Sequence, residues 1–274
     1  MVHDDAVVTA LSGAATRDRP PSMDDLHLLI DLHLDAERQG PGGVAETRRA
    51  IELAGLRGRQ ALAIADIGCG TGASTLVLAA ELDARVTAVD LAPGFLAALR
   101  SRAEAAGLAA RIDTVQGSMD ALPFEPGSLD AIWSEGAVYQ MGFENGVRQW
   151  RRFLKSGGIL AVSELTWLTR QRPAELEAFW VSQYAEVGTA SSKLAVLERE
   201  GYSPVGYFVL PEACWIDAYY RPTQQRFAAF LARHGGSAAA RAVVAAEEAE
   251  IALYERYRAF FGYGFYIARK TEAA

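Results

Sequence analysis

The chain has 274 residues, of which 50% are hydrophobic and 22% are charged, as in ordinary globular proteins with a substantial core. Its 27 Lys and Arg residues against 34 Asp and Glu residues give a net charge of −7, and without a basic run it is a poor candidate for binding nucleic acid. No apolar stretch is long enough to cross a membrane, and the two distant cysteines, Cys69 and Cys214, indicate a reducing cytoplasm and no metal site.

The N-terminal part predicts an arm followed by two helices. Residues 1–21 are polar and unpatterned, and we expect a disordered arm rather than a targeting peptide. Apolar residues then recur at helical steps over residues 22–39, behind a Ser22 cap, and a second helix is expected over residues 44–54.

Strands and helices alternate between residues 61 and 164. The continuous apolar run 61–67 is typical of a parallel strand that is buried on both faces. Because each strand is followed by a helical pattern, this region predicts an α/β, Rossmann-like, doubly wound and mainly parallel sheet. The other strands are expected at 85–90, 112–116, 129–134 and 158–164, and the helices at 73–82, 93–106 and 147–153.

After residue 164 the pattern becomes mainly helical. Helices are expected at 173–186, 191–200 and 237–261, and strands at 207–210 and 263–269, which makes seven strands in all. We predict one domain over residues 22–274, with lid elements from 22–45, 165–200 and 211–261. The long helix at 237–261 is amphipathic. This pattern is typical of a helix that covers the rest of the domain or forms a dimer interface, so the sequence does not exclude a homodimer.

A glycine-rich loop follows the first strand. Residues 66–72 read DIGCGTG, and glycines at 68, 70 and 72 let the backbone approach a ligand that a Cβ would displace. Asp90 ends the next strand, where a carboxylate can accept hydrogen bonds from both ribose hydroxyls. The order of strand, glycine loop, helix and acid predicts a binding site for a nucleotide-like ligand at the carboxyl edge of the sheet.

Two ligands compete for this loop. Gly68, Gly70 and Ala73 also satisfy the dinucleotide pattern G-x-G-x-x-G/A, so the glycines alone do not exclude NAD. Asp66 decides between them, because a carboxylate before the loop would repel a pyrophosphate but suits the positive amino and sulfonium groups of S-adenosylmethionine (SAM). A tight turn without ligand is the minor alternative.

Residues 66–72 resemble the first motif of class I SAM-dependent methyltransferases, especially the branch with the ubiquinone/menaquinone-type enzymes. Residues 117–124 (GSMDALPF) resemble the family's G-D-x-x-x-L-P-F segment, and the resemblance implies that Met119 and Asp120 bind the adenine. Ser118 departs from the usual Asp of that segment. Segments 38–42, 133–139 and 210–215 also look like those of bacterial small-molecule methyltransferases.

The loop and the resemblance together predict a site for SAM and its product S-adenosylhomocysteine (SAH), with a small-molecule acceptor. The predicted ligand-binding residues are Gln39, Gly40, Asp66, Gly68, Gly70, Gly72, Asp90, Leu91, Ser118, Met119, Asp120 and Ser134.

Methyl transfer needs few side chains, so the catalytic residues are harder to identify. Glu135, at the end of the fourth strand, can act as a base or bind SAM or backbone amides; Tyr139 can orient the substrate or pack in the core. The acid and the rings near the same edge predict substrate contacts, against the alternative of a surface acid and ordinary core aromatics. These substrate candidates are Glu164, Trp167, Trp215, Tyr219 and Tyr220.

The prediction is therefore a methyltransferase that acts on an O, N or C nucleophile of a small metabolite. An NAD-linked oxidoreductase on the same sheet and a non-catalytic SAM-binding subunit are the alternatives. Binding of NAD without SAM would favour the first, and an intact SAM site beside a closed substrate cavity would favour the second.

Overall fold

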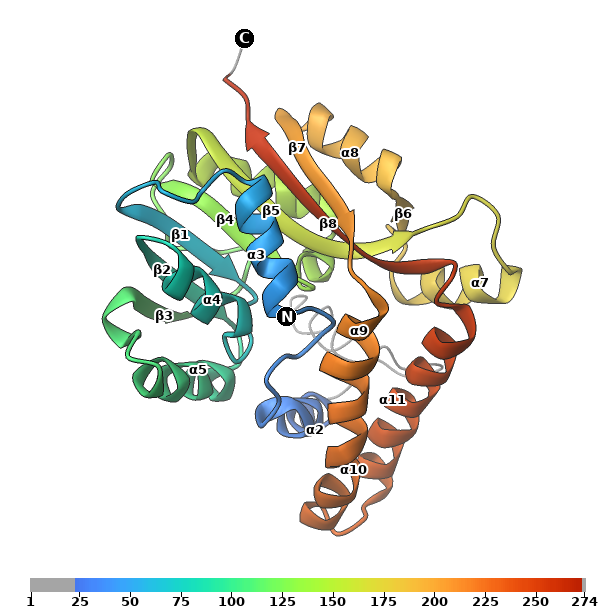
Figure 1. The fold of residues 1–274 in the computed structure, drawn as a ribbon. Helices are drawn as coiled ribbons and strands as arrows, with labels where there is room; N and C mark the ends of the chain where they lie inside the picture. Colours follow the sequence, from blue (N-terminus) through green and yellow to red (C-terminus); the bar gives the residue numbers. More distant parts are fainter. Residues whose placement is uncertain (1–22, 273–274) are drawn as a thin grey trace.

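The computed structural model describes residues 23–272, which fold around a mixed sheet (Figure 1). The order β3-β2-β1-β4-β5-β8-β7 confirms the doubly wound prediction, because neighbours from β3 to β5 are parallel and β8 runs antiparallel to β5 and β7. A two-residue strand, β6, adds to β5. The strands are β1 Leu62–Ile67, β2 Ala84–Asp90, β3 Ile112–Gln116, β4 Leu129–Glu135, β5 Leu154–Trp167, β6 Gly188–Thr189, β7 Tyr202–Val209 and β8 Phe261–Lys270.

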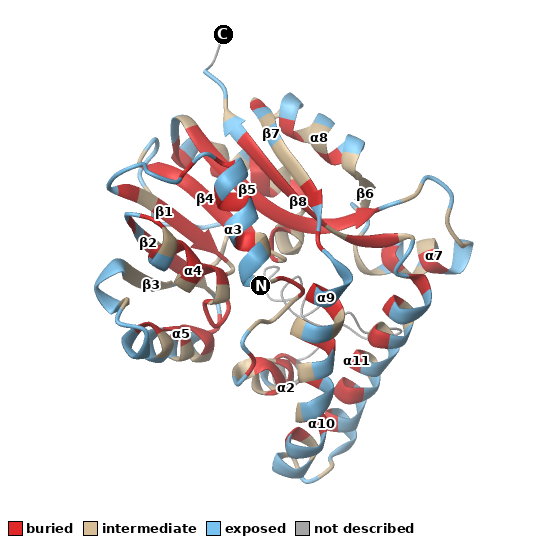
Figure 2. Cartoon of the chain, in the orientation of Figure 1, coloured by how far each residue is buried: buried red, intermediate tan, exposed pale blue. Residues whose placement is uncertain are grey.

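Helices cover both faces of the sheet, whose strands are largely buried (Figure 2). On one face, Ile64 and Val86 pack with side chains of α3 and α4; on the other, Ile132 and Leu160 pack with side chains of α6 and α8. The helices are α2 Met23–Leu34, α3 Val44–Leu53, α4 Ala73–Glu81, α5 Pro93–Ala105, α6 Phe143–Trp150, α7 Ala174–Gln183, α8 Ala190–Arg199, α9 Glu212–Trp215, α10 Arg221–Arg233 and α11 Ala238–Tyr257, with short 3-10 turns at Ala109–Arg111 (η1), Val138–Met141 (η2) and Arg151–Phe153 (η3).

A helical layer formed by α2, α10 and α11 lies below the sheet in Figure 1. The helix α2 contacts both C-terminal helices and also α5, so it bridges this layer and the sheet. Ser237 caps α11 as predicted, since its Oγ accepts a hydrogen bond from the Ala240 amide at 3.2 Å.

The predicted first helix is too long. It ends at Leu34 instead of Gln39 because the carbonyls of Ala36 and Glu37 turn away to accept hydrogen bonds from Arg102 and Thr71. The predicted cap Ser22 and the predicted disordered arm, residues 1–21, lie outside the described residues.

Sheet pairing also corrects the C-terminal half. β5 continues past the predicted end at residue 164 to Trp167, and β7 starts at Tyr202 instead of residue 207. Both strands are longer because β8 pairs along each of them. Phe261 and Gly262, predicted to end the last helix, belong instead to β8 and pair with Trp167 and Thr166. Tertiary pairing thus outweighs the local pattern at both strand and helix ends.

Two helical predictions also change. The helix expected at 147–153 starts at Phe143 and ends at Trp150. Residues 212–233, which the sequence left without a helix, are helical, and a π-helical stretch at Ile216–Tyr220 shifts the phase of the apolar pattern there. Among the described helices, none combines the length and apolarity that a bilayer crossing requires.

Candidate active site

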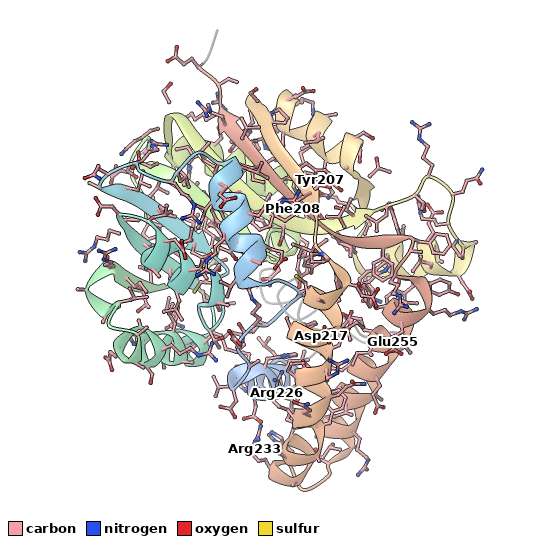
Figure 3. The ribbon with its side chains drawn as sticks, viewed as in Figure 1. Tyr207, Phe208, Asp217, Arg226, Arg233 and Glu255 are labelled. Carbon is pink, nitrogen blue, oxygen red and sulfur yellow. The ribbon has the colours of Figure 1, made fainter. Side chains whose placement is uncertain are left out.

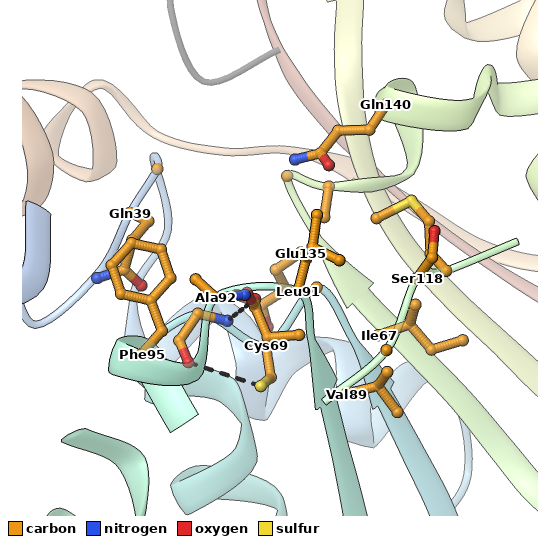
Figure 4. Close-up of a pocket in the computed structure, with 18 of the residues that line it drawn as sticks. Gln39, Ile67, Cys69, Val89, Leu91, Ala92, Phe95, Ser118, Glu135 and Gln140 are labelled. Carbon is orange, nitrogen blue, oxygen red and sulfur yellow. Dashed lines mark hydrogen bonds between the residues drawn. The ribbon is translucent and has the colours of Figure 1, made fainter. Parts of the chain in front are cut away.

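A cavity of about 920 Å³ opens at the carboxyl edge of the sheet, bounded by the loops after β1, β2, β3 and β4 and by α2. Figure 4 shows Phe95 on one side of it and Ser118 on the other, with Leu91 and Glu135 between them in this view. Such a site, outside the carboxyl ends of parallel strands, is where open α/β sheets bind ligands. Of the predicted residues, it brings together Gln39, Gly40, Gly68, Gly70, Asp90, Leu91, Ser118, Met119, Asp120, Glu135 and Tyr139.

The glycine loop has a backbone that other residues rarely adopt. Gly68, Gly70 and Gly72 have φ angles of 70°, 54° and 87°. A Cβ on Gly68 would lie 2.4 Å from the Cβ of Ala137, and one on Gly70 would lie 2.1 Å from Gln39 Oε1. The loop therefore keeps its backbone open toward the cavity only while these positions are glycine.

Asp90 holds the loop and also faces the cavity. Its Oδ2 accepts a hydrogen bond from the Gly70 amide at 2.8 Å, and its Oδ1 accepts one from the Ala92 amide at 2.9 Å. Burial raises the pKa of Asp90 above its usual value, while the backbone amides oppose that shift. Because each carboxylate oxygen has a second lone pair, Asp90 can still accept two hydroxyl donors from a ligand.

Asp66 lies fully buried under the loop and does not line the cavity. Its Oδ2 accepts hydrogen bonds from Ser74 at 2.8 Å and Thr75 at 2.6 Å, whereas Oδ1 has no partner among the described residues. Burial raises the pKa of Asp66 to about 7. A cation bound nearby would favour the ionised form and offset this cost of burial.

The segment before α3 is tied to the glycine loop. Gln39 Nε2 donates to Thr71 Oγ1 at 3.0 Å, and the Thr71 amide donates to Gln39 Oε1 at 2.8 Å. Arg102 of α5 donates to Thr71 Oγ1 and to the carbonyls of Ala36 and Glu37. Gln39 therefore fixes the loop against the N-terminal segment while it lines the cavity.

Glu135 is held by three donors. Arg38 Nη1 lies 2.8 Å from its Oε2, and Thr47 Oγ1 and Trp133 Nε1 donate to its Oε1 at 2.7 and 2.9 Å. The side chains of Arg38 and Glu135 are only 9% and 7% exposed. Because its oxygens are already engaged, this geometry favours a role in fixing Arg38 at the cavity wall over a role as a free base.

We expect Glu135→Gln to lower the free energy of unfolding by about 2 kcal/mol, because a buried Arg38 would lose its charged partner. Urea denaturation measures this. The exposed Glu248→Gln is the matched control and should leave stability unchanged. Unchanged stability together with lost turnover of a methyl acceptor would instead favour the base.

The other predicted ligand contacts are placed as follows. Leu91, Ser118, Met119 and Asp120 lie together on the cavity wall, and Trp150 Nε1 donates to the Met119 carbonyl at 2.9 Å. Ser134 is buried and donates to the Ile67 carbonyl, so it supports the strand below the cavity. Gly72 likewise does not line the cavity but begins α4 as its N-cap.

None of the predicted substrate residues lines this cavity. Trp167, Trp215, Tyr219 and Tyr220 are buried in the main hydrophobic core. Glu164 is fully buried inside β5, three residues before its end, so its predicted place at a strand edge is wrong. Tyr139, by contrast, reaches the cavity and packs edge-on against Tyr184 with ring centroids 5.9 Å apart.

Several cavity residues were missed by the sequence analysis. They come from α2, from the turn after it, from α5 and from the segment after β4, where apolar or amide side chains gave no recognisable motif. Of the residues named below, only Arg38 lies in a segment, 38–42, that the sequence analysis had compared with bacterial small-molecule methyltransferases. Among the missed residues are Leu26, His27, Ile30, Arg38, Phe95, Gln140, Asn145 and Gln149.

Comparisons with known proteins agree with this geometry. A family model described as a methyltransferase domain matches residues 64–158, about a third of the chain. The malonyl-[acyl-carrier protein] O-methyltransferase of Dechloromonas aromatica is 34% identical over 101 residues, which cover 36% of this chain and 35% of that protein. The chain spans only about a quarter to a third of the length of the first curated relatives it matches.

Solved structures extend the likeness to the whole fold. A SAM-dependent methyltransferase from Geobacter sulfurreducens, in complex with S-adenosyl-L-homocysteine, gives a TM-score of 0.78 at 19% identity and covers 88% of this chain and 97% of that one. The [4+2]-cyclase SpnF gives 0.72 at 22% identity, covering 92% and 94%. The chain therefore has the α/β Rossmann-like methyltransferase fold, which by itself does not specify the reaction.

Proposed function

We propose that the protein is a SAM-dependent methyltransferase that acts on a small molecule. The observation that carries this proposal is the glycine loop at the edge of the cavity, with the buried carboxyl group of Asp66 beneath it and that of Asp90 facing the cavity. The carboxyl group of Asp66 beneath the loop would repel a pyrophosphate but suits a ligand with a positive sulfonium, while Asp90 suits the ribose that both ligands carry. This supports SAM over NAD.

The residues present fit SAM. The Oδ1 of Asp66, which has no partner among the described residues, supplies negative potential under the loop, and the glycines hold the loop in a left-handed backbone that residues with a Cβ rarely adopt. Asp90 would hold the ribose hydroxyls, and Met119 and Asp120 would bind the adenine. When bound, SAM supplies an electrophilic methyl group. The chain then has to orient the acceptor and exclude water.

The finer assignments belong to the same proposal. The acceptor is an O, N or C nucleophile, Tyr139 orients it, and the segments 22–45, 165–200 and 211–261 form the lid. Membership of the ubiquinone/menaquinone-type branch, a homodimer and a cytoplasmic location also stay predictions.

Isothermal titration of the purified protein with SAM, SAH and NAD tests the proposal. We expect SAM and SAH to bind and NAD not to bind. Transfer of a labelled methyl group to small molecules of a metabolite extract then separates a methyltransferase from a subunit that only binds SAM. Binding of NAD without SAM would reject the proposal.

Gly68→Ala should weaken SAH binding at least tenfold, because the new Cβ collides with Ala137 and a left-handed φ costs an alanine about 1–2 kcal/mol. Gly107→Ala is the matched control: its φ is 68°, and no atom lies within 4 Å of its Cβ position. It carries the same backbone strain far from the cavity, so its SAH affinity, measured by titration, should equal that of the wild type. Similar losses in both variants would contradict this explanation.

A further inference from the structure

Next to the cavity lies a group of inward-facing acidic and aromatic side chains, which we call the acidic–aromatic cluster. Its acids come from β5 and α11, and its rings come from η2, from the π-helical stretch Ile216–Tyr220 and from β8. Burial, and after it the charges of the nearby acids, raises the pKa of each of the four tyrosines above its usual value. The members of the cluster are Glu164, Glu247, Glu250, Tyr139, Tyr219, Tyr220 and Tyr263.

The cluster adjoins the proposed SAM site directly. Tyr139 belongs to the cluster and also lines the cavity. Gly136 is another lining residue, and a Cβ placed on it would lie 3.0 Å from the ring of Tyr263. The ring of Trp215 extends this aromatic surface, with its centroid 4.9 Å from that of Tyr263. An acceptor held by the cluster would therefore lie beside the bound methyl donor.

Two carboxyl groups of the cluster each have one buried oxygen that receives no hydrogen bond from residues 23–272. Glu164 is fully buried; its Oε1 accepts a hydrogen bond from the Leu165 amide at 3.0 Å, but its Oε2 accepts none from the described residues. Glu247, 5% exposed, contacts His33 through Oε1 at 3.4 Å, and its Oε2 also lacks a partner there. Buried acceptors are rarely left unsatisfied, so both oxygens point to a ligand that donates hydrogen bonds.

Two cations near the cluster, Lys193 and Arg226, donate their hydrogen bonds to groups outside it. Lys193 donates to the Tyr184 hydroxyl at 3.4 Å and lies 4.4 Å from the centre of the Phe143 ring, although its charge also lowers the pKa of Glu164. Arg226, on α10 in Figure 3, donates to the Leu32 carbonyl and to Thr223 Oγ1. Neither cation hydrogen-bonds the unpartnered oxygens.

We propose that the acceptor is a small organic amine, whose nitrogen is received by the unpartnered oxygens of Glu164 and Glu247 and whose substituents pack on the tyrosine rings. An ammonium group offers several N–H donors, and the faces of aromatic rings attract cations. A carboxylate ligand would be repelled, and a hydroxyl offers only one donor. This inference rests on the proposed methyl transfer.

The chemistry balances with an amine. The nitrogen reacts as the free base: its lone pair forms the new N–C bond while the C–S bond breaks, and the bonding electrons stay on the sulfur of SAH. The product is a methylated ammonium, which carries the positive charge that the sulfonium loses. An amine that arrives protonated must first give up one proton, and Glu164 can accept it, since burial raises the pKa of this carboxyl to about 7.

Matched ligand pairs test the inference without knowledge of the natural acceptor. The probes are benzylamine against benzyl alcohol, and butylamine against butan-1-ol, each titrated into the SAH-saturated protein. We expect the cationic member of at least one pair to bind at least tenfold more tightly than its neutral partner. Glu164→Gln and Glu247→Gln should each remove most of this preference, while Glu248→Gln, an exposed acid next in sequence on α11, should keep it.

The SAH titration distinguishes a failure of the proposed function from a failure of the amine inference. If SAH does not bind to the wild type, the proposed function fails. If SAH binds and neither pair shows a cationic preference, including the case where no probe binds, the amine inference is overturned and the proposed function stands. A preference that persists at full strength in both Gln variants, each still binding SAH, also overturns it. The comparison within the wild type holds even if one variant does not fold.

Discussion

Asp90→Ala is expected to weaken SAH binding by at least 100-fold. The substitution removes the two hydrogen bonds that the Gly70 and Ala92 amides donate to this carboxylate, together with the proposed contacts to the ribose. Hydrogen bonds to a charged group contribute about 1.5–3 kcal/mol each, and about 1.4 kcal/mol corresponds to tenfold in affinity. Isothermal titration with SAH measures the effect.

Two further variants test whether the loss of SAH affinity is specific to Asp90 or follows from the loss of any nearby negative charge. Asp90→Asn keeps one acceptor and should retain part of the affinity. Asp113→Ala removes an exposed acid from the neighbouring strand, where it pairs with Arg85, and should leave SAH binding unchanged. If Asp90→Ala bound SAH like the wild type, the assignment of this carboxylate to the ribose would fail.

Trp215→Ala is expected to lower the free energy of unfolding by about 4 kcal/mol, the range found for removal of a buried Trp or Phe ring. Trp215 is 2% exposed, and its ring stacks on Tyr254 with centroids 4.5 Å apart and meets Tyr263 edge-on. Removal would leave a large void between α9, α11 and β8. Chemical denaturation followed by circular dichroism gives the value.

Trp215→Phe is the matched control, because it keeps most of the apolar volume and should cost much less. Trp215 Nε1 has no hydrogen-bond partner among the described residues, so the loss of its N–H removes no bond seen there. The sequence favoured a lid role for this residue. A pure lid residue would instead change acceptor affinity and leave the unfolding transition in place, and that outcome would contradict the packing explanation.

Tertiary contacts change the role that we expect for Glu135. A carboxylate at the end of a central strand is a reasonable base when only its position is known. Arg38 and Thr47 lie far from it in sequence, yet both donate to it. These contacts also make the N-terminal segment part of the cavity wall, which explains why a change at Glu135 is expected to act on stability.

The sequence by itself determined the sheet and the ligand loop. The run 61–67, the glycines at 68, 70 and 72 and the acid at 90 carry local information, because a buried parallel strand, a left-handed turn and a strand-end carboxylate each depend on residue type and near neighbours. For the same reason the doubly wound, mainly parallel sheet and the position of the cavity at its carboxyl edge followed from the alternation of strands and helices.

Only the tertiary structure decided what surrounds that loop. The length of β5, the end of α2 and the helical state of residues 212–233 depend on partners that are distant in the chain, such as β8 and Arg102. The acidic–aromatic cluster is the clearest case. Glu164 and Glu247 are 83 residues apart, and the sequence around each one does not indicate that the two belong to one cluster. Which buried oxygens lack a donor depends on the whole packing around them, and no local pattern in the sequence records it.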